Sequence, residues 1–484
     1  MHHRQPAMES LEPRVLLASS PLTFEAYYPE GYANNTINEY VPITNHGEVE
    51  VEYELHARYE WGERDQLISS GRIAPHSRGG VTISEAGRAA DRLVRDDVPY
   101  ALVLKSTAPL SATMSHYDFG TALGESFTHR PSSAWSFGEG FKSADDSRDY
   151  ILVYNPGQAP VTATITVYHV SGLRVSESIT LGGERRGGWS IQDIAGVPEG
   201  AFSVVVSASG PVVAAQSHYQ LKTGRGYGAL GTPEGGAIAG VVPAIEFDDN
   251  FYERNGDDSP HHSSGHHAAN AFLNVLNTND QATAVTLTFV IDASHGVDVA
   301  PIQRTLTVPG NSRAQLSIRD VPGIPADAEV GVAYRSELPV TVSGSVYQGM
   351  DATGIEAATI AATTWDFGEG FMSRTRAGRG VMDEFYIFNP GARDTLLTIE
   401  FSLHTGEKLT FTKEVDGYEL EGLKIERFLD LTLLPEDVWY GVRITSPRPV
   451  VASMEHWDAA VGGGFSTFGM PGGTIVDLAD VLTI

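Results

Sequence analysis

Glutamate and histidine recur at matching positions along the chain, and these two side chains could do chemistry together. The glutamates stand in Glu-Gly dipeptides, and each histidine precedes an aromatic residue. They are Glu30, Glu139 and Glu369, and His116, His218 and His456. A third copy of the pattern has Val346 at the histidine place and only Asp248 or Asp249 near the glutamate place. Because both groups are lost together, we expect them to be partners, either in a structural contact or in a repeated ligand site.

A second candidate is the polar segment 255–267, which concentrates imidazole and carboxylate groups. Its possible ligands are Asp257, Asp258, His261, His262, His266 and His267. Imidazoles suit zinc, nickel or copper, and the two aspartates could help to bind calcium. The alternative is a solvated loop that binds metal weakly, because a flexible loop loses conformational entropy on chelation. We expect no cofactor beyond a weakly held divalent cation.

Aromatic residues near the start of the chain form a third candidate. Sugar-binding modules stack sugar rings on exposed aromatic side chains. The candidates are Tyr27, Tyr28, Tyr32, Tyr59 and Trp61. Tyrosine and tryptophan are also ordinary strand residues, so a structural role is the alternative.

Known catalytic motifs are absent from the sequence. It contains no Gly-x-Ser-x-Gly elbow, no His-Glu-x-x-His, no P-loop and no dinucleotide-binding glycine motif between a strand and a helix. With 61 acidic residues, a pair of carboxylates carries no information by itself. The sequence therefore predicts that the chain is not an enzyme, with an unrecognised hydrolase as the least favoured interpretation.

Charge and composition exclude several classes of protein. The chain has 33 basic and 61 acidic residues and a net charge of −28, which disfavours binding to nucleic acid. It has no cysteine, so disulfides and cysteine-ligated zinc are excluded. No stretch approaches the ~20 apolar residues that cross a bilayer, so we expect no transmembrane segment.

The elements that must position these residues form a fourfold repeat. A proline, seven mostly β-prone residues and an aromatic recur without a gap at 109–117, 211–219, 339–347 and 449–457. The copies lie about one β-sandwich domain apart, roughly 100 residues. A strand and a Ser/Pro turn precede the proline, as in Ser336–Pro339 and Ser446–Pro449, and predict a hairpin.

Two further signals share the register of this repeat. Each copy has a strand that ends in an asparagine turn, at Asn45, Asn155, Asn277 and Asn389. Copies two and four match best, because 135–141 returns as 365–371 with one substitution. Trp135 and Trp365 open these segments, and we expect both to be buried.

The repeat predicts an all-β protein of four tandem Ig-like β-sandwich domains. The close match of copies two and four favours an arrangement as two pairs. The predicted domains are 21–130, 131–236, 237–357 and 358–484, the last with a C-terminal tail.

The opening of copies two and four, their Asn-Pro-Gly turns and the Pro-Val-Val…aromatic ending resemble the WxFAEG-type repeat domain of bacterial secreted proteins. Residues 10–18 resemble the LEPR-XLL motif near the start of large secreted bacterial proteins, so we interpret 1–20 as an export or processing segment. The resemblance covers nearly the whole chain past Pro21, and is weaker in copies one and three.

The resemblance implies an extracellular or cell-surface bacterial protein. We expect a non-enzymatic structural or adhesive array, whose partners would be surface glycans, matrix proteins or other copies of itself. The alternative is a carbohydrate- or cation-dependent binding module.

Overall fold

The structure is a computed structural model. It describes residues 21–60, 62–118, 121–246, 270–292, 300–325, 328–348, 351–373, 381–425, 437–458 and 463–484. Within these residues the chain is nearly all β-strand, and short helical turns such as α2 (Leu478–Val481) are rare. The expected all-β fold of four β-sandwiches is confirmed. Segment 1–20 lies outside the described residues.

Sandwich 1 consists of two four-stranded antiparallel sheets. One sheet has the order β1 (Phe24–Tyr28), β6 (Tyr100–Ser106), β3 (Val51–Tyr59) and β4 (Gln66–Ile73). The other has the order β5 (Ser77–Ser84), β2 (Asn38–Asn45), β7 (Ser111–Asp118) and β8 (Thr121–Ser126). Burial alternates strictly along β3, as expected for a strand with one face in the core.

The other three sandwiches repeat this plan. Sandwich 2 contains β9 (Ser132–Phe137), β10 (Phe141–Lys142), β11 (Ser147–Asn155), β12 (Val161–His169), β13 (Arg174–Leu181), β14 (Arg185–Ser190), β15 (Gly200–Gln220), β16 (Arg225–Leu230) and β17 (Thr232–Pro233). Sandwich 3 contains β18 (Ala237–Glu246), β19 (Asn270–Asn277), β20 (Thr283–Ile291), β21 (Ile302–Val308), β22 (Ser312–Ser317), β23 (Glu329–Gln348) and β24 (Asp351–Glu356). Sandwich 4 contains β25 (Ile360–Phe367), β26 (Phe371–Met372), β27 (Val381–Phe388), β28 (Thr395–Leu403), β29 (Lys408–Val415), β30 (Leu420–Lys424), β31 (Val438–Asp458), β32 (Gly463–Phe468), β33 (Met470–Asp477) and α2.

The predicted Ser/Pro hairpin is wrong, because the chain does not turn back at this point. In sandwich 4 the single strand β31 runs through Ser446 and Pro449. Its first half pairs with β28 and its second half with β27, so the strand passes from one sheet to the other. The Ser446 hydroxyl donates to the carbonyl of Arg448, 2.5 Å away, where the strand changes sheet. β15 and β23 do the same, whereas sandwich 1 divides the path into β6 and β7.

The four repeated asparagines are buried and have one set of contacts in common. The Asn389 amide donates to the carbonyls of Arg393, Val415 and Asp416, and its oxygen accepts from the backbone N–H of Gly391. The corresponding contacts recur at the other three positions, which are Asn45, Asn155 and Asn277. Each asparagine therefore fastens the end of its own strand to the turns that flank the next two strands.

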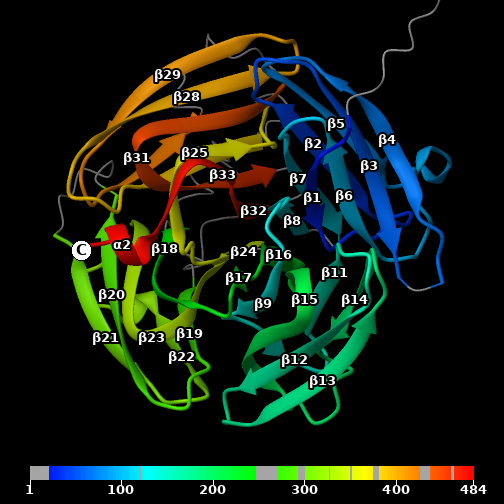
Figure 1. The fold of residues 1–484 in the computed structure, drawn as a ribbon. Helices are drawn as coiled ribbons and strands as arrows, with labels where there is room; N and C mark the ends of the chain where they lie inside the picture. Colours follow the sequence, from blue (N-terminus) through cyan, green and yellow to red (C-terminus); the bar gives the residue numbers. More distant parts are fainter. Residues whose placement is uncertain are drawn as a thin grey trace, which may run out of the picture.

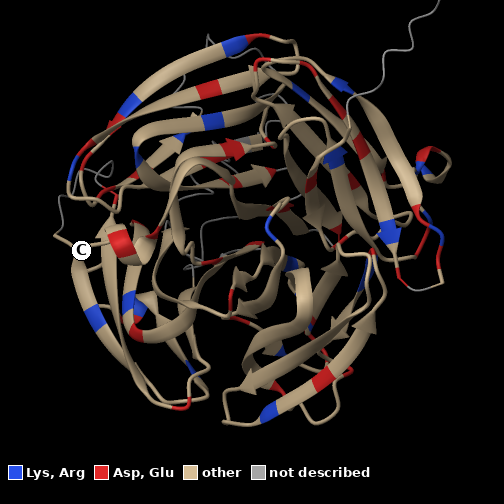
Figure 2. Ribbon diagram, in the orientation of Figure 1, with Lys and Arg blue, Asp and Glu red and all other residues tan. Residues whose placement is uncertain are grey.

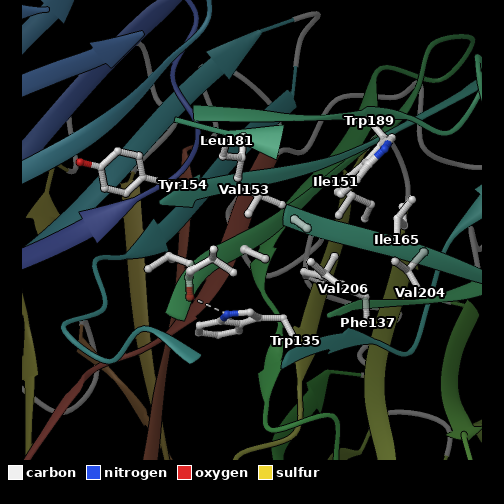
Figure 3. Packing of buried hydrophobic residues seen from close by; sticks show 14 of the residues in the cluster. Trp135, Phe137, Ile151, Val153, Tyr154, Ile165, Leu181, Trp189, Val204 and Val206 are labelled. Carbon is white, nitrogen blue, oxygen red and sulfur yellow. Dashed lines mark hydrogen bonds between the residues drawn. The ribbon is translucent and has the colours of Figure 1, made fainter. Parts of the chain in front are cut away.

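Each sandwich has its own apolar core, and the two repeated tryptophans lie in the cores of sandwiches 2 and 4. Trp135 and Trp365 are buried, as expected, with exposed fractions of 3% and 2%. The indole N–H of Trp135 donates to the carbonyl of Val212 at 2.8 Å, a contact visible in Figure 3. Trp365 donates to the carbonyl of Val450 at the same distance. Each indole thus reaches the strand that changes sheet.

The four sandwiches form a closed ring (Figure 1). Sandwich 4 lies against sandwich 3 and also against sandwich 1, so every sandwich touches two others. Strands β8, β16, β24 and β32 meet at the centre, where β8 lies beside β16 and β32, and β24 lies beside the same two strands. The predicted division into two pairs is not seen, because contacts between successive sandwiches are present all round the ring.

Acidic residues are found on all four sandwiches, including the strands at the centre of the ring (Figure 2). Among the described residues, no helix is long and apolar enough to cross a bilayer.

Candidate functional site

The repeated histidines have carboxylate partners, but these are not the predicted glutamates. His456 Nδ1 lies 2.6 Å from Asp383 and His218 Nδ1 lies 2.9 Å from Asp149. The third such pair joins His116 to Glu39 at 2.9 Å. In each pair the histidine and the carboxylate face one another across two neighbouring strands, β7 and β2 in sandwich 1, β15 and β11 in sandwich 2, and β31 and β27 in sandwich 4.

The carboxylates that pair with the histidines also occupy a repeated position in the sequence, which the fourfold pattern described above does not include. Glu39, Asp149 and Asp383 each stand six residues before the repeated asparagine. In copy three this position is Ala271, which pairs in register with Val346. Carboxylate and histidine are indeed lost together. The Glu-Gly glutamates stand out in the sequence, but strand register determines the actual partner of each histidine.

Burial and charge together set the protonation of these histidines. Burial opposes the charged form of His456, but the charge and hydrogen bond of Asp383 outweigh it and raise its pKa to about 9. The same balance, with Asp149 and Glu39 as partners, raises the pKa of His218 and of His116. The carboxylates also accept from the opening segment, since the N–H of Phe371 lies 3.0 Å from Asp383. These pairs therefore fasten the start of a sandwich to its middle strands.

The Glu-Gly glutamates contact the next sandwich in the ring. Glu139 of sandwich 2 accepts from Asn274 and from the hydroxyl of Tyr347, both in sandwich 3 and both at 2.8 Å. Glu30 of sandwich 1 accepts from Ser217 of sandwich 2. Glu369 of sandwich 4 accepts from Ser115 of sandwich 1 at 2.9 Å. The glutamate of the fourth sandwich therefore closes the ring.

Basic residues on the facing strands complete these interfaces. Arg78 on β5 lies 3.8 Å from Glu369. Arg186 on β14 donates to the carbonyl of Pro29 and to Glu60, and Arg313 on β22 donates to Ser203. Between sandwiches 3 and 4, Lys424 on β30 bonds Glu329 at 2.8 Å. Arg78, Arg186 and Arg313 thus each contact the preceding sandwich in the ring.

Carboxylates also lie between the central strands. Glu125 on β8 accepts from the N–H of Leu230 at 3.0 Å and from the hydroxyl of Thr467, so it joins sandwiches 1, 2 and 4. Burial raises its pKa to about 7. Glu356 on β24 accepts from the N–H of Gly138 at 3.0 Å, and burial raises its pKa well above the usual value. These groups hold the centre of the ring together.

The remaining sequence candidates have different outcomes. The metal candidates Asp257, Asp258, His261, His262, His266 and His267 lie outside the described residues. No other cluster of potential metal ligands occurs within the described parts of the chain. Of the aromatic candidates, Tyr27, Tyr28 and Tyr59 are buried, which contradicts their assignment to an exposed sugar-binding face. Tyr32 is half-buried, and Trp61 is not described.

Comparison with known proteins gives one family match. The model described as "Family of unknown function (DUF5719)" matches residues 129–381, which is just over half of the chain. This span contains sandwiches 2 and 3 and reaches the first residue of β27. No curated protein matches the chain.

Two solved structures show distant similarity to this chain. The crystal structure of Thermotoga maritima 1070 is 18% identical with a TM-score of 0.20, over 23% of this chain and 96% of that one. The crystal structure of a tetra-tandem repeat in the extending region of a large adhesion protein is 10% identical with a TM-score of 0.10, over 90% of this chain and 92% of that one. Neither score supports an inference about function.

Proposed function

We propose that this chain, which belongs to the family of unknown function DUF5719, is a non-enzymatic structural or adhesive protein of the bacterial cell surface or matrix. In this proposal the closed ring acts as a rigid scaffold that presents its outer strands and loops to other surface components.

The proposal rests on one observation, which is that the repeated polar residues make contacts within the protein. The asparagines fasten turns, the histidines pair with carboxylates inside sandwiches 1, 2 and 4, and the glutamates and arginines join neighbouring sandwiches. A preorganised catalytic group needs donors or acceptors directed at a substrate, whereas the contacts just named are made to other parts of the protein. The repeat therefore supports assembly more than chemistry.

The proposed location rests on the resemblance of residues 10–18 and of the Trp135 and Trp365 segments to motifs of secreted proteins. It can be tested by treating intact cells that express the full chain with proteinase K. We expect loss of the protein while a cytoplasmic marker persists. A protein that is protected in intact cells but digested after lysis contradicts a surface location.

The absence of catalysis is tested separately on purified protein. We expect no turnover of polysaccharide, ester or peptide substrates. Turnover that disappears when one acidic residue is replaced would overturn the non-enzymatic part of the proposal, whatever the location.

A further inference from the structure

A cavity of about 660 Å³ lies at the interface between sandwiches 1 and 2. Sandwich 1 contributes Tyr32, Glu60 and His116 to its lining, and sandwich 2 contributes Tyr150, Arg186 and Trp189. This volume falls in the range of small-molecule sites, about 300–1,000 Å³. The cavity is therefore large enough for a ligand of one or two sugar units.

Two buried polar atoms in this lining have unmet hydrogen-bonding capacity. His116 and Trp189 are 3% and 5% exposed, and neither His116 Nε2 nor Trp189 Nε1 has a hydrogen-bond partner within the described structure. A buried N–H without a partner destabilises the structure, so a ligand that accepts from it is favoured. Glu39 holds the other imidazole nitrogen, Nδ1, at 2.9 Å and so fixes the orientation of the His116 ring. The nearest carboxylate oxygen to Nε2 is that of Asp118, another lining residue, at 4.0 Å and beyond hydrogen-bond distance.

The interface between sandwiches 4 and 1 shows how the same position is satisfied elsewhere. There the hydroxyl of Tyr117 lies 3.3 Å from Nε2 of His456, the counterpart of His116. Trp189 also has no counterpart at that interface, because the matching residue on β5 is Val81. The first interface thus differs from the fourth in an imidazole nitrogen without a hydrogen bond and in an added indole. At the second interface His218 Nε2 also lacks a hydrogen bond, but Leu316 stands at the Trp189 position, so the indole sets the first interface apart.

Aromatic rings and balanced charges define the chemistry that this cavity can recognise. Tyr150 lines the cavity, its side chain is 37% exposed, and its ring is nearly perpendicular to that of Tyr219 at 6.2 Å between centroids, so part of the ring is accessible to a ligand. The lining holds three acidic residues, Glu30, Glu60 and Asp118, against two arginines, Arg148 and Arg186, and His116. Arg186 forms an ion pair with Glu60 at 2.6 Å, so the cavity offers donors and acceptors without a large excess of either charge. Sugars present C–H faces to aromatic rings and hydroxyls to carboxylates and N–H groups.

We propose that this cavity binds a neutral saccharide of one or two units, as part of a glycan. Tyr150 stacks on the sugar, Trp189 Nε1 and His116 Nε2 bond its hydroxyls, and the carboxylate of Glu60 accepts from them. The site goes beyond the scaffold role and does not depend on it, since a ring without a ligand remains a scaffold.

The test is calorimetry and saturation-transfer NMR on the full chain, with neutral hexoses, N-acetylhexosamines and their disaccharides as probes. Sialic acid and calcium chloride serve as charged comparators. We expect a neutral saccharide to bind, and Tyr150→Ala to weaken it at least about tenfold, as for a ring at the centre of a binding site. Trp189→Phe should weaken binding by a smaller factor, because it keeps the ring and removes only the N–H.

The matched control is Tyr40→Ala, which alters the same repeat position in sandwich 1. It should leave binding unchanged. Circular dichroism of each variant separates lost binding from lost folding. If Trp189→Phe unfolds, Tyr150→Ala decides the outcome, because the Tyr150 side chain is exposed and its removal is less disruptive to the fold. The proposal is overturned if no neutral saccharide binds at about 10 mM, if only the charged comparators bind, or if Tyr150→Ala and Tyr40→Ala behave alike.

Discussion

At the scale of single residues, one class of side chain serves inside a sandwich and another between sandwiches. The His–carboxylate pairs of His116, His218 and His456 act inside, whereas Glu30, Glu139 and Glu369 act between. A recurring residue type therefore does not have to form a site in each copy. Its role depends on which sandwich its side chain meets.

The His456–Asp383 pair predicts a specific pH dependence. The pKa of His456 is about 9 in the fold, above the usual 6.5, so its contribution is fully present below about pH 6.5 and is lost as pH rises through 9. We expect His456→Gln to lower the free energy of unfolding by about 2–3 kcal/mol at pH 6 and by much less at pH 9.5. Urea unfolding followed by circular dichroism measures this difference.

The control for this prediction is His404→Gln, which changes an exposed histidine beside the backbone of Trp439. It should be nearly neutral at both pH values. An effect of His456→Gln that stays constant from pH 6 to pH 9.5 would show that the pair acts through packing alone.

At the scale of elements, the repeat predicts the strands but not the connection at the Ser/Pro segment, where one strand passes from sheet to sheet. The asparagine turns and the buried tryptophans follow from residue type alone, because Asn favours turns and Trp favours cores. The strand that passes from one sheet to the other does not follow from residue type, since Ser-x-x-Pro is compatible with both a turn and a bend. Only the change of partner from β28 to β27 distinguishes them.

Asn389 gives a prediction at this scale, because its amide donates to three carbonyls in the turns that flank β28 and β29. We expect Asn389→Asp to cost at least as much stability as Asn389→Ala, about 2–4 kcal/mol, because a carboxylate would face the three carbonyls that now accept from the amide. Thermal unfolding measures both variants. Asn34→Asp is the matched control, since only the side-chain oxygen of Asn34 is needed to accept from Thr36, and it should be close to neutral. An Asn389→Asp variant as stable as wild type would rule out the donor role.

At the scale of the whole molecule, the ring could not be predicted from the sequence. The repeat gives the number of sandwiches, but Glu369 and Ser115 are far apart in the chain, and nothing local links them. The cavity was missed for the same reason, because Tyr32 and Trp189 come from different copies and only the interface brings them together. Contacts between copies depend on the angle between sandwiches, which tertiary packing determines.

Glu125 provides a stability test of the ring centre. Its pKa is raised by burial to about 7, so its contribution is present below about pH 4.5 and is lost as pH rises through 7. We expect the free energy of unfolding to fall by about 3 kcal/mol from this group between pH 4.5 and 8, and Glu125→Gln to remove most of that fall. Urea unfolding across this range measures it, with Glu177→Gln on the exposed side of β13 as control. Identical pH slopes for both variants would contradict a buried carboxylate at the centre.

Closure of the ring is the central claim, and small-angle X-ray scattering of the full chain in solution tests it most directly. A compact particle of this length has a radius of gyration of about 23–27 Å, whereas four sandwiches strung end to end would give about 40 Å. We predict the compact value and a scattering curve that fits the closed ring. A radius near 40 Å, or a curve that requires sandwiches 1 and 4 to be apart, would contradict it.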